Sequence, residues 1–182
     1  MNERTAVTTV FLEILEAPTW PGRPFPRPTE IVLEERMDAE HYRELYDDVG
    51  APWLWYERNQ LPTSELQALI DDPSVLIYTL RVDGACAGYV EYKKVSATET
   101  QILYFGLRPD FIGRGLGAAF LDWSVRRSFD DGIDRLWLHT CTLDHPRALE
   151  TYLAAGFREY KRESGWVSIP SSAFARRQSP AE

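Results

Sequence analysis

The pattern of apolar and polar positions predicts strands near the start of the chain and in its middle. Residues 6–16, AVTTVFLEILE, alternate loosely and are rich in β-branched side chains, which is typical of a strand. In residues 74–95, two apolar runs flank Asp83 and Gly84, a dipeptide that suits a tight hairpin because both residues tolerate a positive φ. Residues 100–107 form another β-rich run. The pattern therefore predicts a meander of three antiparallel strands.

Helical spacing appears between these strands. After a short strand in residues 30–36, Asp38 can cap a helix whose apolar positions recur every three or four residues. A second helix is predicted in residues 61–70, where Ser64 and Gln67 have the spacing of a capping box. We expect these two helices to precede the meander.

The second half of the chain alternates helix and strand. Residues 115–129 have a helical pattern with a wide apolar surface, which implies deep packing on a sheet. Residues 135–141, RLWLHTC, predict a strand, residues 144–157 a helix, and residues 157–169 one or two closing strands. Because a helix connects them, we expect the strand at 100–107 and the strand at 135–141 to run parallel.

Proline marks the boundaries of the domain. Five prolines in residues 17–30 remove backbone donors and fix an extended path. We therefore expect residues 1–29 to be an N-terminal strand extension with a stiff linker, residues 30–170 to be the main domain, and residues 171–182 to be a polar tail with a frayed end. The extension could reach a partner subunit, so we expect a homodimer as one use of it.

Composition and charge narrow the class of protein. With 182 residues, of which 44% are hydrophobic, the chain suits one domain. A formal net charge of -8 without a basic tract argues against a nucleic-acid partner. The chain lacks a signal-peptide pattern and a long apolar run, so we expect a cytoplasmic protein without a membrane partner. Its two cysteines have no zinc or disulfide spacing, so we expect no metal.

The segment LRPDFIGRGLGAAFLDW, residues 107–123, carries the strongest chemical signal. It places Gly113, Gly115 and Gly117 between a strand and a helix, an arrangement that binds anions through unpaired N–H groups and the helix dipole. A Walker loop requires a Gly-Lys pair that is missing here. A dinucleotide fold requires a parallel βαβ unit, and only about 65 residues remain after the loop. The pyrophosphate loop of an acyl-CoA enzyme is the remaining interpretation.

Two motifs resemble those of the GNAT superfamily of acyl-CoA-dependent N-acyltransferases. The first is GLRPDFIGRGLGAAFL and the second, some thirty residues later, is HPRALETYLAAGF. The resemblance covers about residues 30–168 and implies an α/β (α+β) fold with a mixed, mostly antiparallel central sheet flanked by helices. The matching residues are Leu107, Pro109, Gly115 and Gly117 in the first motif, and Ala148, Tyr152, Gly156 and Phe157 in the second.

The chain departs from the family pattern at two positions. Ile112 replaces the Arg or Gln of the first motif, and His145 replaces the Asn that opens the second. Main-chain N–H groups bind the pyrophosphate, so the first departure weakens the inference only slightly, and Arg114 can supply charge instead. His145 can bond the pantetheine arm, or it can cap the helix ahead of Pro146.

The resemblance implies acetyl-CoA as co-substrate, with no metal. Main-chain groups of the strand YFGL would hold the pantetheine and polarise the thioester carbonyl. The residues expected to bind the co-substrate are Phe105, Leu107, Ile112, Gly113, Arg114, Gly115, Leu116, Gly117, Ala118 and His145.

Acyl transfer requires an acid for the departing thiolate and a base for the amine. Tyr152, by its match to the second motif, is the expected acid, and the alternative is an ordinary packed tyrosine. Glu91 lies in an apolar strand, where burial would raise its pKa toward that of a base; alternatively, its strand face meets solvent. His139 is a rival base or a structural histidine. We interpret Asp144 as an N-terminal helix charge.

The segment WLWYERNQ, residues 53–60, is the expected acceptor wall, because this region covers the acceptor in the family. Its rings Trp53, Trp55 and Tyr56, with nearby carboxylates, would suit a cation or an apolar amine. Core packing is the competing account for at least one ring.

These residues predict an N-acetyltransferase that acts by direct attack of a primary amine of a small molecule, amino acid or peptide on acetyl-CoA. The alternative is a non-catalytic acyl-CoA-binding module. A third hypothesis, a nucleotide-dependent enzyme, is disfavoured by the missing lysine of the loop.

Overall fold

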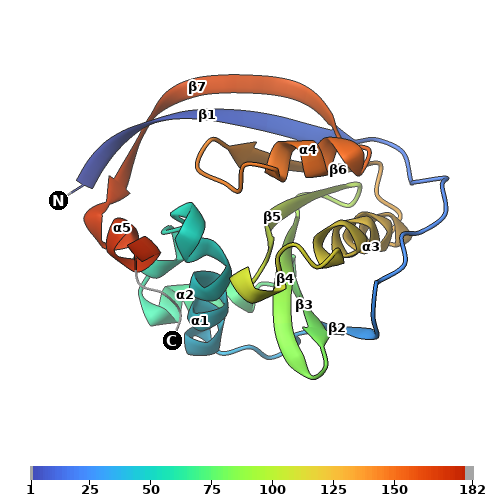
Figure 1. Cartoon of the computed structure of the whole chain (residues 1–182), viewed down its shortest axis with the longest axis horizontal. Helices are drawn as coiled ribbons and strands as arrows, with labels where there is room; N and C mark the ends of the chain where they lie inside the picture. Colours follow the sequence, from blue (N-terminus) through green and yellow to red (C-terminus); the bar gives the residue numbers. More distant parts are fainter. Residues whose placement is uncertain (1, 179–182) are drawn as a thin grey trace.

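The computed structural model describes residues 2–178 and contains one seven-stranded sheet in the order β2-β3-β4-β5-β6-β1-β7 (Figure 1). Every neighbouring pair is antiparallel except β5 and β6, which run parallel as expected. The predicted mixed, mostly antiparallel sheet is confirmed. The strands are β1 (Asn2–Ile14), β2 (Thr29–Leu33), β3 (Val75–Val82), β4 (Ala85–Lys94), β5 (Glu99–Leu107), β6 (Arg135–Cys141) and β7 (Arg158–Pro170).

The hairpin between β3 and β4 follows from its turn residues. Asp83 and Gly84 have φ values of 51° and 81°, so both central residues adopt the positive φ that matches the twist of the flanking strands. β5 then pairs with β4, which completes the predicted meander.

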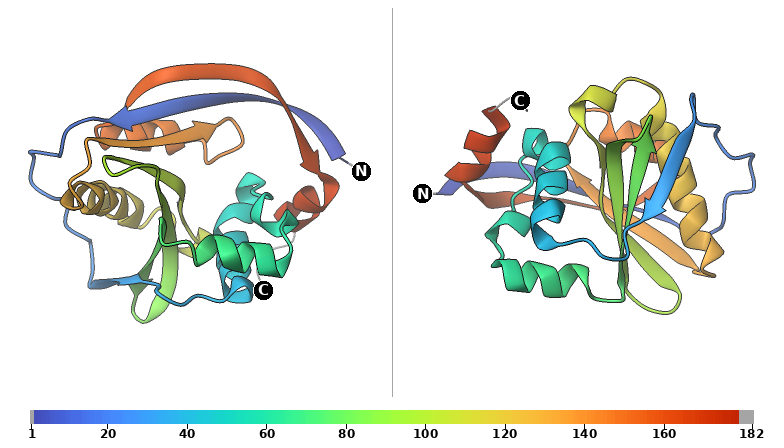
Figure 2. Two further views of the ribbon diagram at one scale, coloured as in Figure 1. Left: turned by 180° about the vertical axis from the view of Figure 1, so that it is seen from behind. Right: turned by 90° about the horizontal axis from the view of Figure 1, so that it is seen from below.

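Helices cover both faces of the sheet (Figure 2). Helix α3, with Phe120 and Leu121, packs on one face, and α1, with Tyr42 and Tyr46, packs on the other. None of the helices in residues 2–178 is long and apolar enough to cross a membrane. The α-helices are α1 (Ala39–Gly50), α2 (Thr63–Ile70), α3 (Leu116–Asp130), α4 (Ala148–Ala154) and α5 (Ser171–Gln178), and the short 3-10 turns are η1 (Ala51–Trp53), η2 (Arg58–Gln60) and η3 (Pro109–Phe111).

One predicted cap is present and another is wrong. The Asp38 carboxylate accepts a hydrogen bond from the backbone N of His41 at 2.8 Å, which caps α1. The capping box expected in α2 does not form, because Pro62 occupies the cap position. Gln67 instead accepts a hydrogen bond from the backbone N of Ala39 at 2.8 Å, so its side chain joins α2 to the start of α1.

The N-terminal segment belongs to the sheet of its own chain. β1 lies between β6 and β7 and is antiparallel to both. The proline-rich linker then crosses α3, where Asp122 accepts hydrogen bonds from Trp20 Nε1 at 3.3 Å and from the backbone N of Arg23 at 2.9 Å. β1 and β7 form a long curved ribbon that runs from β6 to α5 (Figure 1).

The C-terminal segment differs from the expected frayed tail. Residues up to Gln178 form α5, in which Ala173 and Phe174 pack near Leu54 and Ile169. This apolar packing stabilises a helix that the polar sequence RRQ does not predict. The last residues of the predicted tail, 179–182, lie outside the described part of the chain.

Candidate active site

β5 and β6 separate halfway along their length. They pair only from Glu99 to Gln101, opposite Arg135 to Trp137. Directly after the last pair, the ladder between β4 and β5 shifts register, which leaves Leu103 as an extra residue. Such a bulge increases local twist and turns a strand away from its neighbour. Within the described residues, the rest of β5 therefore has no strand partner on its β6 side, and its main-chain groups on that edge can bind a ligand.

The glycine loop links the end of β5 to α3. Gly113 and Gly115 have φ values of 79° and 77°, which side-chain-bearing residues rarely adopt. Gly115 is the N-cap of α3, and no side chain in residues 2–178 caps that first turn. The helix therefore begins with unpaired N–H groups and the positive end of its dipole, which together attract an anion.

Gly117 lies in the first turn of α3 and has room for a methyl group. Glycine is less stable than alanine in a helix, by up to about 1 kcal/mol. A Cβ built on Gly117 would meet only Leu107 Cδ1, at the ordinary contact distance of 3.6 Å. Packing within the described chain thus does not require glycine at this position. Close approach of a ligand to the backbone supplies a reason for it.

The other residues expected to bind the co-substrate differ in exposure: the Leu107 side chain is buried, and Phe105 and Ala118 are half-buried. The Leu116 side chain is fully buried in the core, so only its main chain is available. Ile112 is exposed, and the guanidinium of Arg114 lies 5.3 Å from the ring centre of Phe111. His145 Nδ1 accepts a hydrogen bond from the backbone N of Arg147 at 3.1 Å in the turn before α4, and no side chain within the described residues caps that helix.

Tyr152 brings the second motif against β5. Its ring lies 6.4 Å from Phe105 and 5.9 Å from Phe157, measured between ring centres. Burial raises the pKa of Tyr152 well above its ordinary value, and the negative charge of Asp144 raises it further. The hydroxyl has no hydrogen-bond partner within residues 2–178. Tyr152 is therefore neutral at pH 7 and holds a proton that it can donate.

Glu91 is enclosed rather than solvated. Its side chain is fully buried, so the expectation that its strand face meets solvent is wrong. Arg58 Nη2 lies 2.5 Å from Oε1, and the Tyr42 hydroxyl donates to Oε2. Burial raises the pKa of Glu91, while Arg58 and Tyr42 favour its charged form. Because each oxygen already accepts a hydrogen bond, the geometry favours a role in tying η2 and α1 to the sheet.

His139, the rival base, lies on the exposed face of β6, beyond the last β5–β6 pair. Its ring centre is 5.8 Å from that of Phe11. No polar side chain in the described residues orients its imidazole. A general base is usually oriented by a second group, so the structure gives His139 no added support.

The three aromatic residues of the expected acceptor wall are half-buried. The Trp55 ring lies 4.9 Å from Tyr104 of β5, between ring centres, and Tyr56 packs in the cluster around Leu54. Gly50 makes room for this wall, because a Cβ there would come within 2.2 Å of the Trp55 ring. Each ring therefore contributes to packing and keeps part of its surface exposed.

Asp144 differs from its sequence interpretation. It lies four positions before α4, and its carboxylate does not cap that helix. Oδ2 accepts hydrogen bonds from Thr140 Oγ1 at 2.7 Å and from the backbone N of Cys141 at 2.8 Å, and Oδ1 accepts one from Trp55 Nε1 at 3.4 Å. The loop after β6 thereby meets the acceptor wall. Trp55 and Asp144 are 89 residues apart, and no local spacing indicates such a contact.

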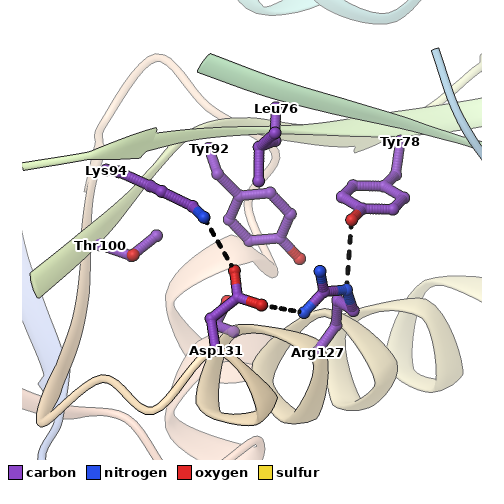
Figure 3. A pocket seen from close by; sticks show the side chains of 8 residues that line it. Leu76, Tyr78, Tyr92, Lys94, Thr100, Arg127 and Asp131 are labelled. Atoms are coloured by element: carbon purple, nitrogen blue, oxygen red, sulfur yellow. Dashed lines mark hydrogen bonds and ion pairs between the residues drawn. The ribbon is translucent and has the colours of Figure 1, made fainter. Parts of the chain in front are cut away.

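Two hollows elsewhere lack the predicted site residues. The hollow in Figure 3 holds about 10 Å³, room for one water, and its charged groups pair with each other: Asp131 with Lys94 at 3.1 Å and with Arg127 at 2.6 Å. A larger hollow of about 240 Å³ borders β2 and the turn after α2, where Asp72 pairs with Lys93 at 2.9 Å. The separated strands and the glycine loop therefore remain the better candidate site.

The comparison with known families agrees with this geometry. The model of the acetyltransferase (GNAT) family matches residues 31–157, which is most of the chain. The fold and this match define an acetyltransferase domain, and the chain belongs to the GNAT family.

The chain also resembles curated relatives and solved structures. It is 32% identical over 136 residues to the mycothiol acetyltransferase of Clavibacter michiganensis subsp. michiganensis, a match that covers 71% of this chain and 38% of that protein. The chain thus spans well under half the length of that relative. A GCN5-related N-acetyltransferase from Sphaerobacter thermophilus superposes with a TM-score of 0.59 at 19% identity, covering 89% of this chain and 50% of the other. One from Kribbella flavida gives 0.58 at 17%, covering 92% and 60%. At these identities the structures support the fold alone.

Proposed function

We propose that this protein transfers an acetyl group from acetyl-CoA to the primary amine of a small molecule, amino acid or peptide. One observation carries the proposal: the uncapped N-terminus of α3, with room for a methyl group at Gly117, follows the half of β5 that has separated from β6. A pyrophosphate suits the first feature and an extended amide-bearing chain suits the second. The proposal assigns the pyrophosphate to Gly113–Ala118 and the pantetheine to the free edge of β5.

Acetyl-CoA supplies an activated thioester. The proposal gives β5 main-chain N–H groups the task of polarising the thioester carbonyl. Tyr152, which is neutral, donates its proton to the sulfur as the C–S bond breaks. Trp53, Trp55 and Tyr56 form one wall of the acceptor site and exclude water from it.

An amine-dependent thiol assay tests this function. Acetyl-CoA is mixed with the protein and a panel of primary amines, and free thiol is measured. The proposal predicts release only when an acceptor is present. The enclosed Glu91 favours one alternative, a module that binds acyl-CoA without catalysis. That module would bind acetyl-CoA tightly and release no thiol with any amine.

We expect Gly117→Ala to raise the stability of the protein and to weaken its binding of CoA. Alanine should raise the free energy of unfolding by up to about 1 kcal/mol, because Gly117 is helical and a methyl group has room. The same methyl group should block close approach of the pyrophosphate and weaken CoA binding at least about tenfold, or about 1.4 kcal/mol. Urea unfolding and calorimetric titration with CoA measure the two effects.

Gly165→Ala, in β7, is the control, since it adds the same methyl group where a Cβ meets no atom within 4 Å. It should leave CoA affinity unchanged. Equal CoA affinity in Gly117→Ala and wild type would contradict the assignment of the pyrophosphate to the glycine loop.

A further inference from the structure

The carboxylate of Asp144 is fixed at the end of β6. Oδ2 accepts two short hydrogen bonds, from Thr140 Oγ1 and from the backbone N of Cys141, and the backbone N of Asp144 donates to the Cys141 carbonyl at 3.1 Å. These bonds close a tight turn. A carboxylate held in this way loses little freedom when it binds a ligand.

The other oxygen keeps accepting capacity. Oδ1 receives only the Trp55 indole N–H, at 3.4 Å, which is longer than the usual range of about 2.7–3.2 Å for N–H···O bonds. In residues 2–178 Asp144 forms no ion pair. Three carboxylates near the wall have cationic partners: Glu91 has Arg58, Asp47 has Arg176 and Asp48 has Arg108. Glu57, within the wall segment, has no cationic partner among the described residues, and its Oε2 accepts hydrogen bonds from the Tyr46 hydroxyl at 3.0 Å and from the backbone N of Tyr56 at 3.3 Å. Oδ1 is therefore a negatively charged acceptor that can take a cation.

Asp144 contacts the acceptor wall through Trp55. Its negative charge also contributes to the raised pKa of Tyr152, the proposed acid. Direct transfer requires the acceptor nitrogen and the acid to lie near the same thioester.

We propose that Asp144 binds the amino group of the acceptor through Oδ1, beside the Trp55 ring, and takes a proton from its nitrogen during transfer. This inference rests on the proposed function. A cationic ammonium first loses one proton to water, because attack needs a free electron pair. The C–N bond then forms, the nitrogen passes a second proton to Asp144, the C–S bond breaks, and the thiolate takes a proton from Tyr152. Both side chains recover their starting state by exchange with water.

The same contacts favour one class of acceptor. An ammonium gains from the fixed charge of Asp144, because hydrogen bonds between charged groups are stronger than neutral ones. These contacts therefore favour a cationic amine as the acceptor.

Binding of n-butylamine, a cation at pH 7, tests this assignment without knowledge of the natural acceptor. The Trp55 indole N–H signal is followed by NMR during titration of wild type, Asp144→Asn and the control Asp130→Asn, which removes an equal charge from the exposed end of α3. We expect saturable binding in wild type and in the control, and at least tenfold weaker binding in Asp144→Asn. The three proteins should not differ in their affinity for n-butanol, the neutral isostere. Equal n-butylamine affinity in Asp144→Asn and wild type would overturn the assignment.

A measurement on wild type alone covers the case in which Asp144→Asn does not fold. The side-chain carboxyl ¹³C signal of Asp144 should shift saturably with n-butylamine and not with n-butanol. A signal that does not respond to the cation would contradict the proposal.

Acetyl-CoA titrations of the same proteins separate this inference from the proposed function. Unchanged acetyl-CoA affinity with a lowered kcat/KM for the best amine of the panel is the expected result for Asp144→Asn. Full amine acetylation by Asp144→Asn would contradict the role of Asp144 in binding the amine and accepting its proton, and would leave the proposed acetyltransferase function standing. An Asp144-dependent cation site without thiol release for any amine would reject the function and the proton transfer, and retain only the binding.

Discussion

Replacing Arg58 by methionine is expected to lower the free energy of unfolding by about 3–5 kcal/mol, the usual cost of removing one partner of a buried ion pair. Arg58 is almost fully buried, and its guanidinium contacts both Glu91 and the Tyr42 hydroxyl. Without it, a carboxylate remains in the core with only Tyr42 as a hydrogen-bond donor. Urea unfolding at pH 7 measures the loss.

The pH dependence of this variant has a definite sign. With Arg58 gone, burial raises the folded-state pKa of Glu91 above its unfolded value of about 4.3. A raised folded-state pKa contributes stability that is fully present below the unfolded pKa and is lost as the pH rises through the folded-state pKa. The deficit of Arg58→Met should therefore be smaller at pH 4 than at pH 7.

The double variant Arg58→Met, Glu91→Leu is the control for this pair. It removes both charges, so most of the lost stability should return. A double variant that is no more stable than Arg58→Met would mean that packing of the arginine, and not the ion pair, holds η2 on the sheet.

Tyr152→Phe is expected to lower kcat by about 10- to 1000-fold, within or near the usual range for loss of a general acid. Phenylalanine keeps the ring that packs on Phe105 and Phe157 and removes only the hydroxyl. Affinity for acetyl-CoA should therefore stay within a factor of two of wild type. Steady-state kinetics with the best amine and calorimetry with acetyl-CoA give the two numbers.

The competing account of Tyr152, an ordinary packed tyrosine, makes the opposite prediction. A packing residue whose hydroxyl has no partner would lose little when that hydroxyl is removed. An unchanged kcat in the folded Tyr152→Phe protein would support packing and leave the thiolate to be protonated by water.

Local chemistry explains which parts of the fold could be predicted from the sequence. Asp83 and Gly84 determine a hairpin because their own backbone preferences select the turn. Asp38 caps α1 through a hydrogen bond that spans three residues. The parallel pairing of β5 and β6 follows from the helix that connects them. Each of these inferences depends on neighbours in the sequence.

The missed features depend on distant partners. The pair of Arg58 and Glu91 spans 33 residues, and the sequence alone does not show that a turn after α1 lies over β4. Gln67 has the spacing of a capping box, yet its side chain bonds the start of another helix. Helix α5 owes its order to contacts near Leu54 and Ile169 that its polar composition does not reveal. Tertiary contacts decide all three cases.

Transfer of a labelled acetyl group tests the central claim most directly. Acetyl-CoA with a ¹³C-labelled acetyl group is incubated with the protein and each amine of the panel, and the label and free thiol are followed together. The account predicts that label appears in a new amide in amounts equal to the thiol released, for at least one cationic amine, and that Tyr152→Phe slows this transfer. Binding of acetyl-CoA with label found only in unreacted thioester or in free acetate would contradict it.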